Sequence, residues 1–268
     1  MRAALHEDRL LLAFQPVVCA ETGQVDYFEC LLRMRSEQGN IIAAAEFITP
    51  LEELGVIGLI DRFVLQKTVE LLAADPEVRL GFNVSGLTVS DRAWLRSLTS
   101  LLRRRPDLGP RLVVEITETA ALGDIAESAH FVDTLRQSGC RVALDDFGAG
   151  YTSLRHLQAL PVQIIKIDGS LIRQMTGKSH TRVFLRHLLG LARNCRLITV
   201  AESVEQPEEA ALLRLEGISR LQGYLIGRPT VERSWRTMKQ TSTCCLARPA
   251  PDGTPPCAAH SLPPVRGS

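Results

Sequence analysis

The sequence has no apolar run approaching the roughly 20 residues that a membrane helix needs. It also lacks the charged region and apolar core of a secretory signal, because His6–Arg9 precede only a short apolar run. The seven cysteines are odd in number, irregularly spaced and without a CxxC pair. These absences argue against a disulfide framework and against structural zinc. We therefore expect reduced thiols, no membrane segment and a cytoplasmic location.

The chain also lacks a large net charge, since 31 Lys and Arg residues nearly balance 30 Asp and Glu residues. A formal charge of +1 over 268 residues gives no reason to expect DNA or RNA binding. A small anionic ligand stays compatible with this balance, because a local site needs only a few placed charges. The length and the 45% hydrophobic content fit one large α/β domain with a sizeable core.

Short β-type runs alternate with longer helical segments along most of the chain. Eight such runs over about 230 residues favour a TIM-type (β/α)8 barrel. The two leading runs lie close together, so the barrel is expected to begin with an antiparallel first strand. A doubly wound open sheet is the alternative. The expected strands are Leu12–Val18, Asp26–Met34, Leu80–Val84, Leu112–Thr117, Arg141–Asp145, Gln163–Ile167, Leu197–Ala201 and Arg220–Gln222.

Two helices carry start and stop signals in the sequence. Asp124 can cap the first, with Glu127 at the capping-box position and Gly139 after the last turn. Pro207 opens the second in the first-turn position that suits proline, and Gly217 closes it.

The composition changes after Val231. Prolines become frequent and apolar periodicity fades. We expect a barrel domain over residues 1–235 and a disordered tail containing Pro and Cys over residues 236–268.

Polar residues interrupt the apolar strands at or near their C-terminal ends. They are Asn83, Glu115, the pair Asp145–Asp146, Lys166 and Glu202. In a parallel barrel these ends converge on one mouth, where active sites lie. Each residue alone has an ordinary explanation, because a strand-end acid often caps the next helix and a buried lysine often pairs with an aspartate.

Asp145 and Asp146 are harder to explain singly, because adjacent carboxylates repel unless a cation lies between them. The set contains no His or Cys, so hard oxygen ligands favour Mg²⁺ or Mn²⁺ over Zn²⁺. Two such ions suit phosphodiester hydrolysis, where they clamp the attacking and leaving oxygens. A loop with two glycines, Asp146–Ser153, follows the acidic strand and permits tight turns.

Several ordered motifs resemble those of the EAL-domain phosphodiesterases of bacterial cyclic di-GMP signalling, from about Leu11 to Pro229. The matching runs are Phe14–Val17, Glu29–Arg33, Asn83–Ser85, Glu115–Glu118, Asp145–Ser153, Lys166–Asp168, Ala201–Glu205 and Gln222–Tyr224.

The resemblance implies a metal-dependent enzyme that opens cyclic di-GMP to linear pGpG, and it implies a role for each matching residue. Glu29, Asn83, Glu115 and Asp145 would hold one metal, and Asp145, Asp146 and Glu202 the second. Asp145 would bridge the two, and Lys166 would hold the attacking water, so the implied catalytic residues are Lys166, Glu202 and Asp145. Arg33 would bind a phosphate, Gln222 would support the ligand network, and Gln15 and Asp61 are weaker substrate contacts. Glu118 would brace the loop that begins with Phe147 and Gly148, which in the family also affects dimerisation.

The chain departs from the family pattern at a few positions. Cys30 replaces the signature Ala, but it should point away from Glu29 because neighbours on a strand alternate faces. Other departures are Ala149, Thr152, Gln163, Ser203 and a shifted proline in Thr49-Pro50. These changes bear on the rate of the reaction rather than on its type.

Other functions remain open from the sequence. One is a weakly active or inactive EAL domain that acts as a cyclic di-GMP receptor or a protein-interaction module. Such domains typically lose the signature Glu or the paired Asp, and this chain keeps both. A Schiff-base aldolase using Lys166 is disfavoured, because the surrounding acids would keep the amine protonated. A homodimer and an upstream sensor or diguanylate cyclase are further partners that the family suggests.

Overall fold

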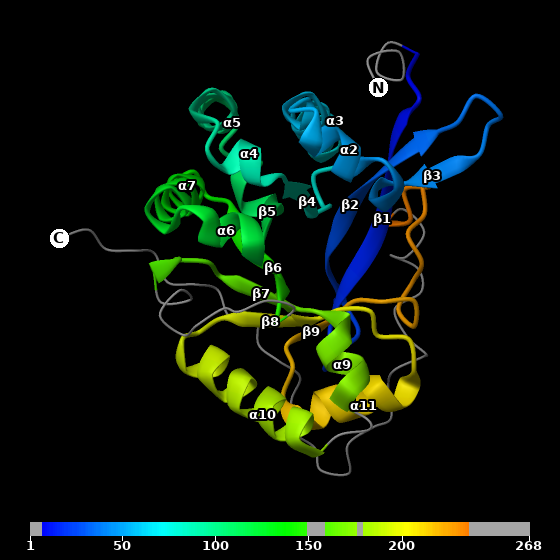
Figure 1. Ribbon diagram of the computed structural model, residues 1–268, viewed down its shortest axis with the longest axis vertical. Coiled ribbons are helices and arrows are strands. Elements are labelled where there is room, and N and C mark those ends of the chain that lie inside the picture. Colours follow the sequence, from blue (N-terminus) through cyan, green and yellow to red (C-terminus); the bar gives the residue numbers. More distant parts are fainter. Residues whose placement is uncertain (1–6, 149–158, 176–178, 236–268) are drawn as a thin grey trace.

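The computed structural model describes residues 7–148, 159–175 and 179–235. Its sheet closes into a barrel, because β1 pairs with β2 on one side and with β9 on the other (Figure 1). The strand order around the barrel is β1-β2-β4-β5-β6-β7-β8-β9, and β3 extends β2 outside the ring. The predicted TIM-type barrel is confirmed, and the open-sheet alternative is wrong. The strands are β1 (Leu10–Cys19), β2 (Val25–Arg35), β3 (Ile41–Ala43), β4 (Leu80–Val84), β5 (Leu112–Thr117), β6 (Arg141–Phe147), β7 (Ile164–Ile167), β8 (Ile198–Ala201) and β9 (Arg220–Leu221).

Helices cover the outside of the barrel. In Figure 1, α3, α5 and α7 lie on the side of β4 and β5, and α10 and α11 lie beyond β8 and β9. The α-helices are α2 (Ile48–Glu53), α3 (Ile57–Ala74), α4 (Gly86–Val89), α5 (Arg92–Arg104), α6 (Glu118–Gly123), α7 (Ile125–Gln137), α9 (Gly169–Met175), α10 (Ser179–Asn194) and α11 (Pro207–Glu216), with 3₁₀ turns at Ala44–Glu46 and Gly109–Arg111. None of these helices is long and apolar enough to cross a bilayer. The expected tail, residues 236–268, lies outside the described residues.

The first strand is antiparallel to both of its neighbours, as predicted, whereas the ladders from β2–β4 to β8–β9 are parallel. β4 and β5 have the predicted bounds, and β6 continues to Phe147, two residues beyond the expected end. β3 was not predicted, because three residues are too few to show an alternating pattern in the sequence.

Alternation along each strand sorts side chains between two environments. On β5, Leu112, Val114 and Ile116 face the helices and join the main core, whereas Val113 and Glu115 face the barrel interior. The inward apolar residues form a layer that we call the floor layer: Val17, Tyr27, Val113, Ala143, Ile164 and Val200. Two residues after the floor-layer residues of β2, β5, β6, β7 and β8 lie charged residues of the mouth. They are Glu29, Glu115, Asp145, Lys166 and Glu202, and Glu202 directly follows β8.

The predicted helix signals are borne out. Asp124 Oδ1 accepts a hydrogen bond from the Glu127 amide at 3.0 Å at the start of α7. Pro207 lies in the first turn of α11, and Gly217 ends that helix in the left-handed conformation, with φ +89°.

The C-terminal end of α10 holds Arg196 at φ +56°, where glycine is the preferred residue. The Leu197 amide donates to the Ala192 carbonyl at 2.8 Å, which is the six-residue closure of a Schellman motif. The left-handed conformation costs a residue with a Cβ roughly 1–2 kcal/mol, partly offset by the greater chain entropy that glycine loses.

We expect Arg196→Gly to raise the free energy of unfolding by about 0.5–1 kcal/mol. Urea denaturation measures it, with Arg196→Ala as the matched control that keeps the strain; an equal gain in both variants would contradict the explanation.

The N-terminal end of the barrel is closed by a buried aspartate. The β1–β2 register shifts between Val17↔Tyr27 and Val18↔Val25, which leaves Asp26 as the extra residue of a bulge. Asp26 forms ion pairs with Arg79, Arg141 and Arg220 at 3.5, 3.2 and 3.0 Å. Burial opposes ionisation here, but Arg141 and Arg220 outweigh it and lower the pKa of Asp26. The charged cluster at this end is therefore distinct from the one at the mouth.

Candidate metal centre

Lys166 stands at the centre of the mouth with four carboxylates around its ammonium group. Its Nζ lies 3.1 Å from Glu29, 2.6 Å from Glu115, 3.1 Å from Asp145 and 2.9 Å from Glu202. The lysine side chain is 1% exposed and comes from β7. On the same strand, Ile164 belongs to the floor layer, and Ile165 and Ile167 belong to the main core. Burial disfavours its charge, but the four acids reverse that effect and raise the pKa of Lys166 well above its ordinary value. In the metal-free protein Lys166 is therefore a cation and a hydrogen-bond donor.

Amide side chains fix Glu29 from two directions. Asn83 Nδ2 donates to Glu29 Oε1 at 2.6 Å, and Gln222 Nε2 donates to Glu29 Oε2 at the same distance. Because the Asn83 nitrogen is turned toward Glu29, its carbonyl oxygen faces away and can serve as a ligand. The network continues from Gln222 to Gln15 at 3.3 Å, and from Gln15 to the Gly227 carbonyl at 3.0 Å.

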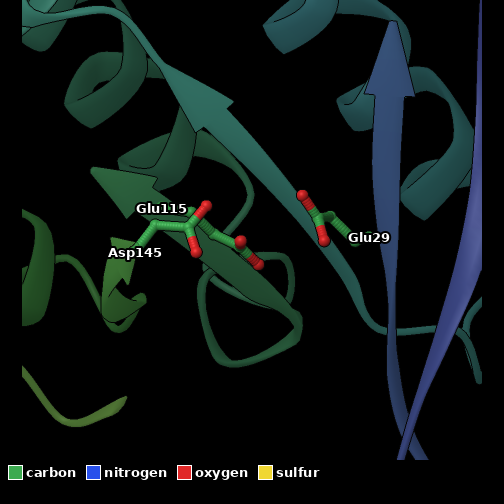
Figure 2. Close-up of side chains that lie close together, drawn as sticks. All are labelled: Glu29, Glu115 and Asp145. Carbon is green, nitrogen blue, oxygen red and sulfur yellow. The ribbon is translucent and has the colours of Figure 1, made fainter. Parts of the chain in front are cut away.

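The acids form two groups of three that share one residue. Glu29, Glu115 and Asp145 offer oxygens within 4.8 Å of one another, and so do Asp145, Asp146 and Glu202. Figure 2 shows the first group, with side chains from β2, β5 and β6 pointing toward one another. Oxygen sets of this kind suit hard divalent cations. Glu115 Oε1 is moreover buried without a hydrogen-bond partner among the described residues, which fits an oxygen available to a metal.

A local irregularity brings two neighbouring acids to the same mouth. Consecutive residues of a regular strand would face opposite sides, but the β6–β7 register shifts between Leu144 and Phe147. Asp146 has φ +57°, and its amide donates to Asp145 Oδ1 at 3.0 Å. Asp tolerates this left-handed conformation better than most residues. The bulge therefore lets Asp146 join Asp145 in the second group of acids.

The cluster carries more negative than positive charge. Five carboxylates face one ammonium, so full ionisation leaves four uncompensated negative charges, which equals the charge of two divalent cations. Burial is the largest cause that raises the pKa of Glu115, to about 8, with Glu29 adding to it. Burial likewise raises the pKa of Asp145, Asp146 and Glu202. In the absence of a metal, burial therefore makes these four acids harder to ionise than free carboxyl groups.

This charge imbalance predicts how the metal-free protein responds to pH. An acid whose folded pKa is raised binds more protons in the folded state, so stability falls as pH rises from the unfolded to the folded pKa. For Glu115 this window runs from about 4.5 to about 8. In EDTA we expect the melting temperature to fall between pH 5 and pH 8, and Mg²⁺ at pH 8 to restore it. Thermal unfolding at matched ionic strength measures this; a melting temperature that rises toward pH 8 in EDTA would contradict it.

The remaining predicted site residues lie around this centre. Arg33 is half-buried, and its Nη1 donates to the Leu32 carbonyl at 2.8 Å. Glu118 Oε2 accepts from the Gly148 amide at 3.0 Å, which ties α6 to the first residues after β6. Phe147 is buried, and Gly148 adopts φ +95° with the Leu171 side chain in the space of a Cβ. The rest of the predicted loop, residues 149–153, lies outside the described residues.

Asp61 has its hydrogen bonds within the protein. Its Oδ2 accepts from the Ser85 amide at 3.1 Å, from the Ser85 hydroxyl at 2.6 Å and from the Thr88 hydroxyl at 2.5 Å. The side chain is 4% exposed. These contacts fix the turn that follows Asn83, and a substrate contact by Asp61 stays a prediction.

The departures from the family pattern have different surroundings. Cys30 is buried in the main core, so it does face away from Glu29 as predicted. Gln163 accepts a hydrogen bond from the Val142 amide at 2.8 Å. Ser203 adopts φ +53° directly after Glu202 and packs against Gly169, where a Cβ would meet the Ser203 side chain. Thr49-Pro50 lies in α2, whereas Ala149 and Thr152 fall outside the described residues.

Two contacts near the centre were not predicted from the sequence: that of Tyr27 with Gly81 and that of Tyr224 with Arg228. Tyr27 and Gly81 lie directly below the acids, and Tyr224 lies at the mouth with the Arg228 guanidinium 4.1 Å from its ring centroid. Tyr27 could have been found as an aromatic residue two positions before Glu29, which places it on the same face of β2. Tyr224 follows Gln222-Gly223 in a run that was noted only as a motif.

The fold and the acids define a (β/α)8-type barrel whose mouth carries a buried carboxylate cluster suited to divalent metals. A family model described as the EAL domain matches residues 1–229. The chain belongs to the EAL domain family.

Relatives and solved structures agree with this assignment. The chain is 32% identical over 233 residues to the cyclic di-GMP phosphodiesterase PdeF of Escherichia coli K12, and 33% identical over 220 residues to PdeL, a cyclic di-GMP phosphodiesterase of the same strain. The matches cover 85% and 80% of this chain, but only 31% of PdeF and 61% of PdeL. The structure of the PaMucR phosphodiesterase in its c-di-GMP complex is similar with a TM-score of 0.78 and 31% identity, covering 85% of this chain and 95% of that one. The FimX EAL domain from Pseudomonas aeruginosa bound to c-di-GMP gives 0.80 and 27%, covering 86% and 95%.

Proposed function

We propose that this chain hydrolyses cyclic di-GMP to linear pGpG with two divalent cations, Mg²⁺ or Mn²⁺. The observation that carries the proposal is that two groups of three acids share Asp145. Together these groups offer oxygens for two adjacent ions and an excess of negative charge that matches the charge of two such ions. The named activity of PdeF and PdeL, and the c-di-GMP complexes of similar structures, support the choice of substrate.

The geometry of the mouth supports the two ligand sets that the family resemblance implies. Glu29, Glu115, Asp145 and the Asn83 carbonyl would hold one ion, and Asp145, Asp146 and Glu202 the other. Bound there, the ions would polarise the phosphodiester and acidify the attacking water.

Lys166 acts as a donor in this proposal. Its ammonium group would donate a hydrogen bond to the oxygen of the attacking water and so hold that water in place. Asp145 and Glu202, the acids to which the family resemblance gives a catalytic role, would take the proton that the water loses, and both contact the Lys166 Nζ. Arg33 would bind a non-bridging phosphate oxygen, and Gln222 and Gln15 would keep Glu29 in place.

The assay that tests the proposal uses purified protein, labelled cyclic di-GMP and chromatography of the products. We expect conversion to pGpG with Mg²⁺ or Mn²⁺, none with EDTA, and inhibition by Ca²⁺, whose larger and looser coordination misplaces the water. Binding without conversion over several hours in either metal would favour the receptor alternative. Full activity in Ca²⁺ alone would contradict the ligand geometry.

Assembly with other chains extends the proposal. The partners that the family suggests are a second copy of the chain and an upstream sensor or diguanylate cyclase. We propose that such a partner acts through the Glu118–Gly148 contact, because that contact joins α6 to the residues that follow Asp145 and Asp146. The chain spans about a third of PdeF, so the activity of the whole relative is no guide to these partners.

A further inference from the structure

Tyr27 is the polar side chain of the floor layer. It is 1% exposed and lies two residues before Glu29 on β2, so its ring extends across the barrel beneath the acids. A Cβ built on Gly81 of β4 would lie 2.8 Å from the Tyr27 ring atom Cε2 and 2.8 Å from Glu115 Oε1. Because Gly81 has no side chain, the edge of the Tyr27 ring and Glu115 Oε1 can both lie close to its backbone.

The two groups that meet there are a donor and an acceptor without partners. The Tyr27 hydroxyl and Glu115 Oε1 are both buried, and neither has a hydrogen bond among the described residues. The other Glu115 oxygen, Oε2, is held by Lys166 at 2.6 Å. Buried polar atoms are almost always hydrogen-bonded, directly or through ordered water. A buried hydroxyl and a buried free carboxylate oxygen, whose side chains both approach Gly81, are thus matched in chemistry and lie in the same part of the barrel.

We propose that Tyr27 is a positioning residue for the metal centre, whose hydroxyl donates to Glu115 Oε1, directly or through one buried water, and fixes that carboxylate for the first ion. This inference rests on the proposed function, because it needs a metal held by Glu29, Glu115 and Asp145. A carboxylate oxygen has two acceptor positions, so Oε1 can accept from the phenol and face a cation together.

A phenol suits this position better than a second cation would. A tyrosine hydroxyl ordinarily keeps its proton at neutral pH, so it is a neutral donor. A neutral donor orients the carboxylate without cancelling the negative charge that attracts the metal. The Arg141 guanidinium lies 5.6 Å from the centroid of the Tyr27 ring, which holds the ring from the N-terminal end of the barrel.

The test is Tyr27→Phe in the full chain, which removes one oxygen and keeps the ring. Mg²⁺ titration calorimetry should show affinity about 10-fold weaker than the parent, as for other groups that orient a metal ligand. The melting temperature in EDTA should change little, because without a metal the hydroxyl makes no hydrogen bond to another described residue that its loss would break. The control Ile164→Val trims the same floor layer without removing a polar atom, and it should lower the melting temperature and leave the affinity unchanged.

The outcomes separate the inference from the function on which it rests. Equal Mg²⁺ affinity in Tyr27→Phe and the parent would overturn the positioning role. A lower melting temperature in EDTA with unchanged affinity would assign Tyr27 to packing alone and would also overturn it. A parent that binds no Mg²⁺ would refute the metal centre and the inference together. A parent that binds Mg²⁺ without cleaving cyclic di-GMP would refute the enzyme but leave the test of Tyr27 intact.

Discussion

Lys166→Met is expected to lower turnover of cyclic di-GMP at least 100-fold while leaving nucleotide affinity close to that of the parent. The ammonium contacts four carboxylates and, in the proposed reaction, the attacking water. Such a contact strengthens as the water becomes a nucleophile, so its loss falls on the catalytic rate rather than on binding. Oriented donors of this kind are worth about 10²–10³ in rate.

The same substitution is expected to destabilise the metal-free protein. Removing one partner of a buried ion pair costs about 3–5 kcal/mol, because the other charge stays buried. Here the methionine leaves Glu29, Glu115, Asp145 and Glu202 without their shared cation, so the carboxylates must take up protons or repel one another. Mg²⁺ or a lower pH should therefore recover stability, whereas neither should recover turnover.

Three measurements separate these effects: product formation in Mg²⁺, nucleotide titration in Ca²⁺ where cleavage is suppressed, and melting in EDTA. Lys67→Met is the matched control, because Lys67 pairs with Glu70 at 3.1 Å on an exposed helix face. Exposed pairs contribute little, so this control should change stability by less than about 0.5 kcal/mol. Near-normal turnover in Lys166→Met would show that the assigned role is wrong even if the enzyme class is right.

The sequence predicted the barrel well where one strand face meets the helices and the other meets the lumen. On β4 and β5 both faces are buried, so each strand stands out as a short apolar run with one polar residue, and its ends are sharp. The same contrast located Asn83, Glu115 and Lys166. β3 and the closure of β1 onto β9 depend on three or fewer paired residues, which leave no pattern along the chain.

The irregular features of the site were beyond the sequence for a different reason. Strand alternation alone would send Asp145 and Asp146 to opposite faces, and only the shifted β6–β7 register unites them. The bulge at Asp26 and the contact of Tyr27 with Gly81 likewise depend on which strands are neighbours across the barrel. Such pairings link residues distant in sequence, so a single chain without its fold does not show them.

Asp145→Asn and Asp146→Asn are expected to differ in how many divalent ions the protein retains. Asp145 belongs to both acid groups, whereas Asp146 belongs only to the group with Glu202. An amide keeps one oxygen ligand but loses the negative charge, and the affinity of hard divalent ions depends on the number of charged oxygen ligands. Asp145→Asn should therefore weaken both ions, and Asp146→Asn should weaken one and leave Glu29, Glu115 and Asp145 to hold the other.

Titration calorimetry with Mn²⁺ gives the stoichiometry directly: two ions for the parent, one for Asp146→Asn and none at comparable affinity for Asp145→Asn. Turnover should fall at least 100-fold in both variants, because the clamp on the attacking and leaving oxygens needs both ions. Asp133→Asn is the matched control, since that aspartate pairs with Arg136 on the exposed face of α7 and should keep both ions and full activity. Two ions retained in Asp145→Asn would contradict a shared ligand. A stoichiometry of one ion in the parent would show that the centre holds a single metal. The negative charge assigned to the second ion would then have to be compensated by Lys166.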